Sequence, residues 1–398
     1  MSFVVLSAII AANSLFSTYI NCRQYQKLGE KMPETAIKIY TQETWSRSVQ
    51  YSKEKLIFHT LSEIVDSCKD ILHLLYLEPW HLFFARRFTN PAVPFVFSYL
   101  ITNQIFKIPF SAFSDFVIER RYGFNKKTLK VFVTDIFIMF LLTLCIGWPF
   151  LFTSFHIISK FSNFEIFLGG FIVVFQLFMM WIYPVVIAPL YNKFTPLEDQ
   201  SLKKNVEELA AKVGFKVGKI EVMDGSKRSG HSNAYFVGFG RTKKIVFYNT
   251  ILEQLNESET IAVLAHELGH WHYSHIIQLL IVGWAETFGY IFAFKMFVAE
   301  KSSQTIAISL LKFIFAASSV SVPLMLLTHS INRMFEKQAD RFAVDQGYGN
   351  ELKAALLKLH TENMAMPVVD WLYSAVGYSH PHVFERLEFI DQAMKKKE

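Results

Sequence analysis

Cysteine is scarce in this sequence, and charged residues are fewer than in a typical soluble protein. The three cysteines, Cys22, Cys68 and Cys145, lie far apart, which argues against a disulfide framework and a cysteine-based zinc site. Charged residues make up 19% of the 398 residues, whereas soluble domains carry about 25%. The net charge of +6 comes without a basic cluster interleaved with aromatic residues, so we expect no nucleic-acid partner.

Apolar residues are abundant instead, at 52% of the chain with 40 phenylalanines. Apolar stretches of about 20 residues are candidate membrane spans, and a weaker seventh stretch also carries acidic residues. No basic residue precedes the first stretch, which favours a retained membrane helix over the alternative, a cleaved signal peptide. The expected spans are 2–21, 56–77 (the weaker one), 93–113, 131–155, 165–190, 276–299 and 304–328.

Basic residues predict how these spans are oriented. Arg120, Arg121 and Lys126 lie in one short connection, whereas Lys160 is the single basic residue of the next. Because positive charge gathers in cytosolic loops, we expect the N-terminus outside and the C-terminus in the cytosol. We expect four regions: helices one to five at 1–190, a cytosolic α+β zinc protease insert at 191–275, helices six and seven at 276–328, and a helical cytosolic part at 329–398.

The stretch Ile261–His275 carries the clearest chemical motif, His266-Glu267-Leu268-Gly269-His270. Histidines four apart share one face of a helix, so both can bind one zinc ion. Glu267 lies beside that metal and can accept a proton from a bound water. Gly269 allows another element to approach closely. Within the insert, we expect strands at 219–223 and 244–248 and an amphipathic helix at 202–213.

A catalytic zinc ion needs a third protein ligand. A histidine ten residues after His266 would provide it in one large class, but that position is Ile276. Glu336 on a later helix is the expected ligand, and Asp340, four residues on, can hydrogen-bond the outer nitrogen of a ligand histidine.

Four further side chains are candidates or near neighbours. His272 and His275 are expected to pack or hydrogen-bond, since His275 would point elsewhere on a continuous helix. His380 could stabilise the oxyanion or be structural. Asn233 could bind the substrate backbone from an edge strand or belong to a turn.

These motifs together resemble the CAAX prenyl proteases of the first type. The resemblance is carried by the zinc motif and by segments spread from about residue 90 to about 390, of which the Gly-Phe-Asn and Ala-Pro-Leu pieces are the most specific. These segments are Ile108–Phe110, Val117–Glu119, Tyr122–Lys126, Ile187–Glu198, Ser232–Tyr235, Glu336–Asp340, Asp370–Ser374, Ser379–Pro381 and Glu385–Leu387.

The resemblance implies a fold and a reaction. Seven transmembrane helices would form a barrel around a water-filled intramembrane chamber, closed on the cytosolic side by the zinc domain. The substrates would be farnesylated or geranylgeranylated CAAX proteins in the lipid bilayer, from which the last three residues are removed. Some family members also cut upstream in the precursor.

The resemblance also implies roles for individual residues. His266, His270 and Glu336 would bind one Zn²⁺ ion, Glu267 would be the general base, and Asp340 would be the partner of a ligand histidine. Asn233 and His380 would contact the substrate backbone near the metal. Arg386 would lie near the site in a structural or electrostatic role. Asn249 departs from the family, which is expected to have an aspartate there, in the strand after the substrate strand.

Other functions remain open at this point. A related membrane quality-control protease would share the zinc motif, and an inactive scaffold would share the fold. Lys395–Lys397 are either a solvated end or a dilysine retrieval signal. With the family resemblance, that signal would favour the endoplasmic reticulum membrane; the inner nuclear membrane is a second location.

Overall fold

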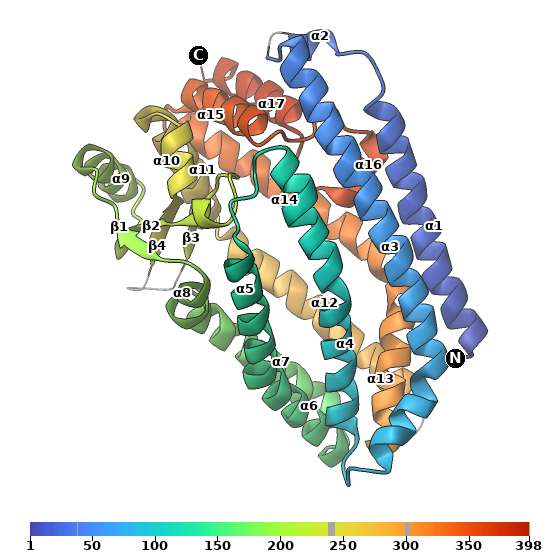
Figure 1. Ribbon diagram of the computed structural model, residues 1–398. Helices are drawn as coiled ribbons and strands as arrows, with labels where there is room; N and C mark the ends of the chain where they lie inside the picture. The colour runs from blue at the N-terminus through green and yellow to red at the C-terminus, as the bar shows by residue number, and fades with distance from the viewer. Residues whose placement is uncertain (38, 238–242, 299–302, 398) are drawn as a thin grey trace.

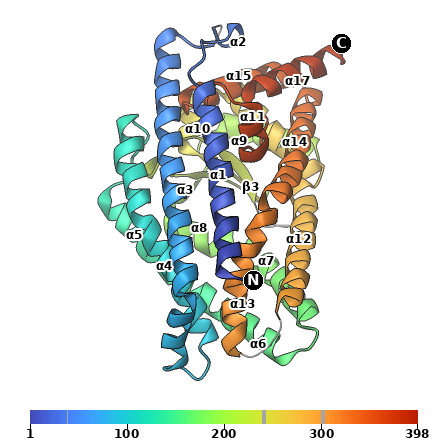
Figure 2. The same ribbon diagram turned by 90° about the vertical axis from the view of Figure 1, so that its right-hand side faces the viewer.

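Helices account for most of the chain in the computed structural model, which describes residues 1–397 apart from 38, 238–242 and 299–302. The helix α3 (Gln42–Ala85) runs through most of the length of the molecule, and α1 (Phe3–Lys27), α4 (Ala92–Phe113) and α5 (Leu129–Leu142) are shorter. A small sheet and several shorter helices gather towards its upper end (Figures 1 and 2).

The other elements complete this arrangement. Short π-helical segments interrupt the long helices, as η1, η2 and η3, and 3₁₀ turns occur at η4 and η6. The elements are α2 (Glu34–Ile37), η1 (Ser114–Glu119), η2 (Thr143–Gly147), α6 (Trp148–Lys160), α7 (Phe164–Ile182), η3 (Tyr183–Ile187), α8 (Ala188–Tyr191), β1 (Phe194–Pro196), α9 (Gln200–Lys212), β2 (Lys219–Met223), η4 (Gly225–Lys227), β3 (Ala234–Val237), β4 (Lys244–Tyr248), α10 (Asn249–Gln254), α11 (Glu257–His272), α12 (His275–Phe297), α13 (Ser303–Ala317), η6 (Ser318–Val320), α14 (Ser321–Asp345), α15 (Gly349–Glu362), α16 (Trp371–Gly377) and α17 (Val383–Lys395).

Five helical stretches in the described chain are long and apolar enough to cross a membrane, which makes this a multi-pass membrane protein. Their side chains point largely outward: Phe137 and Val174 are each 66% exposed, an arrangement that suits lipid rather than water. The stretches are Phe3–Lys27, Leu129–Lys160, Phe164–Tyr191, His275–Phe297 and Ile306–Asp345.

The two remaining expected spans, 56–77 and 93–113, are helical within α3 and α4 but more polar. Glu63 and Asp66 lie in the first, and Lys107 lies in the second. They therefore stay predictions as membrane spans. The helix at the end of the last expected span does not stop at residue 328 but continues through α14 to Asp345, because nothing after Pro323 in its first turn breaks the helix.

Over the described residues, the sheet has four strands in the order β1-β2-β4-β3. β2 and β4 match the expected strands at 219–223 and 244–248 and pair in parallel, whereas β1 and β3 pair antiparallel to their neighbours. α9 matches the expected amphipathic helix to within two residues. Asn249 is the first residue of α10 and not part of the strand, a correction to the sequence reading. In the described sheet β3 is an edge strand.

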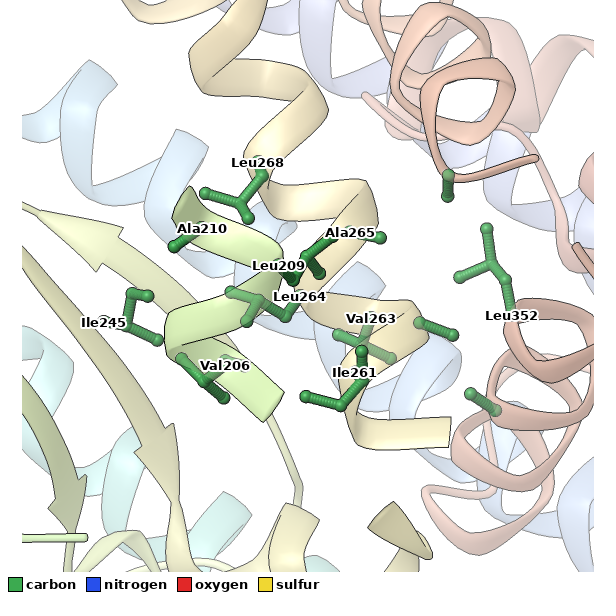
Figure 3. Packing of buried hydrophobic residues seen from close by; sticks show 14 of the residues in the cluster. Val206, Leu209, Ala210, Ile245, Ile261, Val263, Leu264, Ala265, Leu268 and Leu352 are labelled. Atoms are coloured by element: carbon green, nitrogen blue, oxygen red, sulfur yellow. The ribbon is translucent and has the colours of Figure 1, made fainter. Parts of the chain in front are cut away.

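One apolar core joins the sheet to the helices behind it. Leu209 of α9, Ile245 of β4 and Leu264 and Leu268 of α11 pack together in it, and Leu352 brings in α15 (Figure 3). A separate cluster packs α1, α3, α4, α6, α7, α12 and α13 against one another. The first core holds α11 firmly, so that its opposite face can carry a reactive site.

Candidate metal centre and active site

Local sequence determines where the motif helix α11 begins. The Asn256 side chain accepts a hydrogen bond from the Glu259 backbone N–H, and the Glu259 carboxylate accepts one from the Asn256 N–H. This reciprocal capping box starts the helix. One face, with Leu264 and Leu268, is buried in the core, and the face with His266 and His270 lines a cavity.

Three side chains converge at this cavity. The Nε2 atoms of His266 and His270 are 3.2 Å apart, and they lie 3.5 Å and 3.2 Å from the carboxylate oxygens of Glu336 on α14. Zinc–ligand bonds of about 2.0–2.1 Å in a tetrahedral site place neighbouring ligand atoms ~3.3 Å apart. Glu336 Oε2 is also buried without a hydrogen bond, which a cation would relieve. The donor set therefore fits a metal ion.

A glycine allows the two ligand-bearing helices to come this close. A side chain at Gly269 would place its Cβ 2.9 Å from Ala339 Cα and 3.0 Å from Phe342 Cβ. α11 and α14 therefore touch backbone to backbone, one residue from His270 and three from Glu336.

Asp340 and Arg386 support the first ligand from behind. Asp340 is fully buried, and its Oδ1 accepts a hydrogen bond from His266 Nδ1 at 2.9 Å. Arg386 of α17 binds both oxygens of that carboxylate, at 2.6 and 2.9 Å. Burial alone would lower the pKa of the Arg386 guanidinium, but the neighbouring carboxylates of Asp340 and Glu336 outweigh it and raise the pKa. Because the Nδ1–H of His266 donates to Asp340, the Nε2 atom of His266 is free to bind a metal.

His275 supports the second ligand, which corrects the expectation that it points elsewhere. α11 ends at His272, and Ser274 adopts a left-handed conformation (φ 56°) that turns the chain into α12. This turn brings His275 Nδ1 to 2.9 Å from His270 Nδ1, while His275 Nε2 donates to Gln338 Oε1 at 2.8 Å. Because the proton of His275 is on Nε2, its Nδ1 accepts a hydrogen bond from His270 Nδ1–H. The Nε2 atom of His270 then carries no proton and is free to bind a metal. His272, by contrast, packs on Phe342.

The cavity beside the cluster has a volume of about 440 Å³, and we call it the metal cavity. Glu267 lines it, and burial raises the pKa of the Glu267 carboxyl, partly offset by the two nearby imidazoles. His380 reaches in from the segment before α17, with its Nδ1 2.9 Å from Glu336 Oε1. Asn233, immediately before β3, and Arg386 also line it. Every residue expected at the site lies in or directly behind this cavity.

A polar cluster that sequence reasoning missed holds the segment before β3. Glu119 of η1 accepts hydrogen bonds from Tyr51 at 2.8 and 2.9 Å and lies 3.4 Å from His231 Nε2. Phe124, in the Gly-Phe-Asn segment, stacks on the His231 ring at 4.2 Å. His231 is two residues before Asn233, so this cluster anchors the strand to the helices of the N-terminal half. The only hint of Glu119 in the sequence is its place in the segment Val117–Glu119, which resembles the family. Its spacing from other residues does not indicate a role.

The fold and this site define the class of the protein: a multi-pass membrane metallopeptidase with a His-Glu-x-x-His helix. Residues 21–193 match the family model described as "CAAX prenyl protease N-terminal, five membrane helices", and residues 196–394 match "Peptidase family M48".

Individual relatives agree with these family models over nearly the whole chain. The chain is 38% identical to CAAX prenyl protease 1 homolog of Arabidopsis thaliana, with 96% of each chain covered. It is 35% identical to CAAX prenyl protease 1 of Saccharomyces cerevisiae, covering 99% of this chain and 96% of the relative.

A solved structure gives the same result. The crystal structure of S. mikatae Ste24p superposes with a TM-score of 0.93 at 35% identity, with 98% of both chains covered. The chain belongs to the CAAX prenyl protease 1 family, within peptidase family M48.

Proposed function

We propose that this protein is a zinc endopeptidase that removes the last three residues from proteins ending in a prenylated CAAX sequence. One observation carries the proposal: two histidines and a glutamate meet at tetrahedral spacing beside the half-buried Glu267, in a chain of the CAAX prenyl protease 1 family. The convergence of all four side chains favours an active enzyme over an inactive scaffold.

The roles of the residues follow from their positions. His266, His270 and Glu336 would hold the ion. When bound, the ion would polarise the scissile carbonyl and lower the pKa of its water to about 7. Glu267 accepts a proton from the attacking water and delivers it to the leaving amine. His380 donates a hydrogen bond to the developing oxyanion. Asn233 binds the substrate backbone, and Asp340 with Arg386 keeps His266 oriented.

The membrane arrangement is part of the same proposal. All seven expected helices, α3 and α4 included, surround a water-filled chamber, with the N-terminus outside and the metal centre open to the cytosol. The four regions at 1–190, 191–275, 276–328 and 329–398 then have the membrane and cytosolic roles assigned above, although the last boundary lies within α14. We place the enzyme in the endoplasmic reticulum membrane.

The test uses the purified full chain in lipid nanodiscs with a farnesylated CAAX peptide and its unprenylated twin. We expect zinc-dependent release of the terminal tripeptide from the farnesylated peptide. Glu267→Gln should abolish release without removing the metal. Glu253→Gln, the same chemical change at an exposed position of α10, should leave release unchanged.

Two outcomes would contradict the proposal. Equal cleavage of both peptides would indicate a broader membrane-protein protease. A zinc-loaded chain that cuts neither peptide would indicate a scaffold.

A further inference from the structure

A second cavity shares His270 with the metal cavity but is otherwise lined by different residues. It has a volume of about 540 Å³, within the range of about 300–1,000 Å³ typical of small-molecule sites. Its walls come from the end of α7 with η3, from β3, and from the turn into α12. We call it the apolar cavity; its lining residues are Met179, Met180, Tyr183, Phe236, Val237, Lys243, His270, Trp271, Ser274, Ile276 and Ile277.

Strand β3 connects the two cavities. Asn233, just before the strand, and Ala234, its first residue, line the metal cavity, and Phe236 and Val237, at its end, line the apolar cavity. The Asn233 carbonyl accepts from Tyr248 of β4, so by alternation Ala234 and Phe236 turn their backbone groups to the free edge. The Ala234 N–H is accordingly outside the ladder and donates to the Asn233 side chain. An extended peptide can therefore add to this edge and pass the metal centre.

We propose that the apolar cavity receives the prenyl chain of the substrate, while the metal cavity receives the three residues that are released. This inference rests on the proposed function, in which the cleaved bond directly follows the prenylated cysteine. The prenyl chain must then lie within one residue of the metal, on the side opposite the departing tripeptide. His270 lines both cavities, which meets that requirement.

The chemistry of the two cavities fixes the direction of the substrate. The metal cavity offers Arg386, His380 and Asn332 to a peptide that ends in a carboxylate. The apolar cavity offers mainly Met, Ile and aromatic side chains to a hydrocarbon. The substrate therefore runs from the Phe236 end towards the Asn233 end, antiparallel to β3.

Lys243 is the one lysine or arginine among the described residues that line the apolar cavity, and it does not favour an anionic ligand. The Lys243 ammonium lies 4.7 Å from the ring centre of Trp271 and 5.0 Å from that of Phe215. It is therefore already held by two aromatic faces.

The walls also suit a ligand that arrives from a bilayer. α7 with η3 and α12 both belong to stretches able to cross a membrane, and Ile276 and Ile277 are 39% and 54% exposed. A prenyl chain inserted in lipid can thus reach the cavity along apolar surface. η3 is a π-helical segment containing Pro184, and such distortions of helices often occur at functional sites.

The decisive variants fill the apolar cavity. Ile277→Trp and Met180→Trp introduce indole rings into its walls. Ile281→Trp is the matched control, because it lies one turn further on α12, is 57% exposed and does not line the cavity. Each protein is assayed for kcat/KM on peptides that differ only in the sulfur substituent: methyl, geranyl, farnesyl or geranylgeranyl.

We expect the farnesyl-to-methyl ratio of kcat/KM to fall at least about tenfold in the two filling variants, as for a pocket that loses room. In Ile281→Trp the ratio should equal that of the unaltered protein. Unchanged ratios in both filling variants, with a clear farnesyl preference in the unaltered protein, would overturn the inference. Failure of the unaltered protein to release any tripeptide would overturn the proposed function, and the inference with it.

A second measurement does not depend on turnover. A CAAX peptide with a diazirine on its farnesyl chain is photolysed on zinc-loaded Glu267→Gln protein. We expect the labelled residues to lie in the segments 179–183 and 276–277. Labelling confined to other segments would overturn the inference even if a filling variant misfolds.

Discussion

The close contact at Gly269 can be tested by adding a single methyl group. In Gly269→Ala the new Cβ would lie 2.9 Å from Ala339 Cα and 3.0 Å from Phe342 Cβ. Carbon atoms pack best at about 3.5–4.0 Å, so α11 and α14 must separate by ~0.5–1 Å. The histidines lie on one of these helices and Glu336 on the other. Ligand distances in a metal site hold to about 0.2 Å, so the separation is large enough to disturb the site.

The expected effect is larger on metal binding than on folding. Overpacking costs about 1–3 kcal/mol, while replacing a helical glycine by alanine returns about 1 kcal/mol. The free energy of unfolding should therefore fall by roughly 0–2 kcal/mol. Zinc affinity should fall by about 10–100-fold, the usual effect of disturbing the support of a metal ligand.

The assay is competition for zinc with a chromogenic chelator, alongside thermal unfolding and tripeptide release. Gly283→Ala is the matched control, because no atom lies within 4 Å of a Cβ placed there in α12. It should bind zinc and cleave as the unaltered protein does. The reasoning is refuted if Gly269→Ala keeps full zinc affinity, or if Gly283→Ala loses as much.

Three further substitutions test other parts of the site. Asp340→Asn should lower zinc affinity by about 10–100-fold, because His266 loses a charged partner; unchanged affinity in chelator competition would contradict this role. Asn233→Ala should lower kcat/KM for the CAAX peptide with bound zinc unchanged, and normal kcat/KM would show that the side chain does not bind substrate. Burial raises the pKa of the Glu119 carboxyl, but hydrogen bonds from His231 and Tyr51 and the charge of Lys55 outweigh it and lower the pKa from 4.5 to about 2. Because the folded-state pKa is depressed, the carboxylate stabilises the fold above pH 4.5 and this contribution is lost as the pH falls towards 2. Glu119→Gln should therefore lose less stability than the unaltered protein between pH 5 and 3 in urea unfolding, and identical losses would contradict the pairing.

Local patterns were enough to predict much of the site. The i, i+4 spacing of His266 and His270 requires only that the segment is helical, and the strands at 219–223 and 244–248 follow from local alternation. Glu336 and Asp340 repeat the same spacing on a later helix. The chemistry of zinc ligands then singles out Glu336 as the partner of the histidine pair.

Two features of the site depend on contacts that spacing does not encode. His275 reaches His270 because Ser274 takes a left-handed conformation, which serine rarely adopts and which its sequence neighbours do not predict. Glu119, Tyr51 and His231 meet although 180 residues separate the outermost pair.

The sequence by itself determined the class of this protein: apolar stretches long enough for a bilayer, and a helix whose period aligns His266 and His270 on one face, with Glu267 next to the first of them. Both depend on short-range periodicity, which a chain expresses wherever it folds. Only the tertiary structure decided how Glu336 meets that helix, how His275 supports it, and that the edge strand runs from a polar cavity to an apolar one. Those arrangements come from the packing of α7, α11, α12 and α14, and packing joins residues without regard to their separation along the chain.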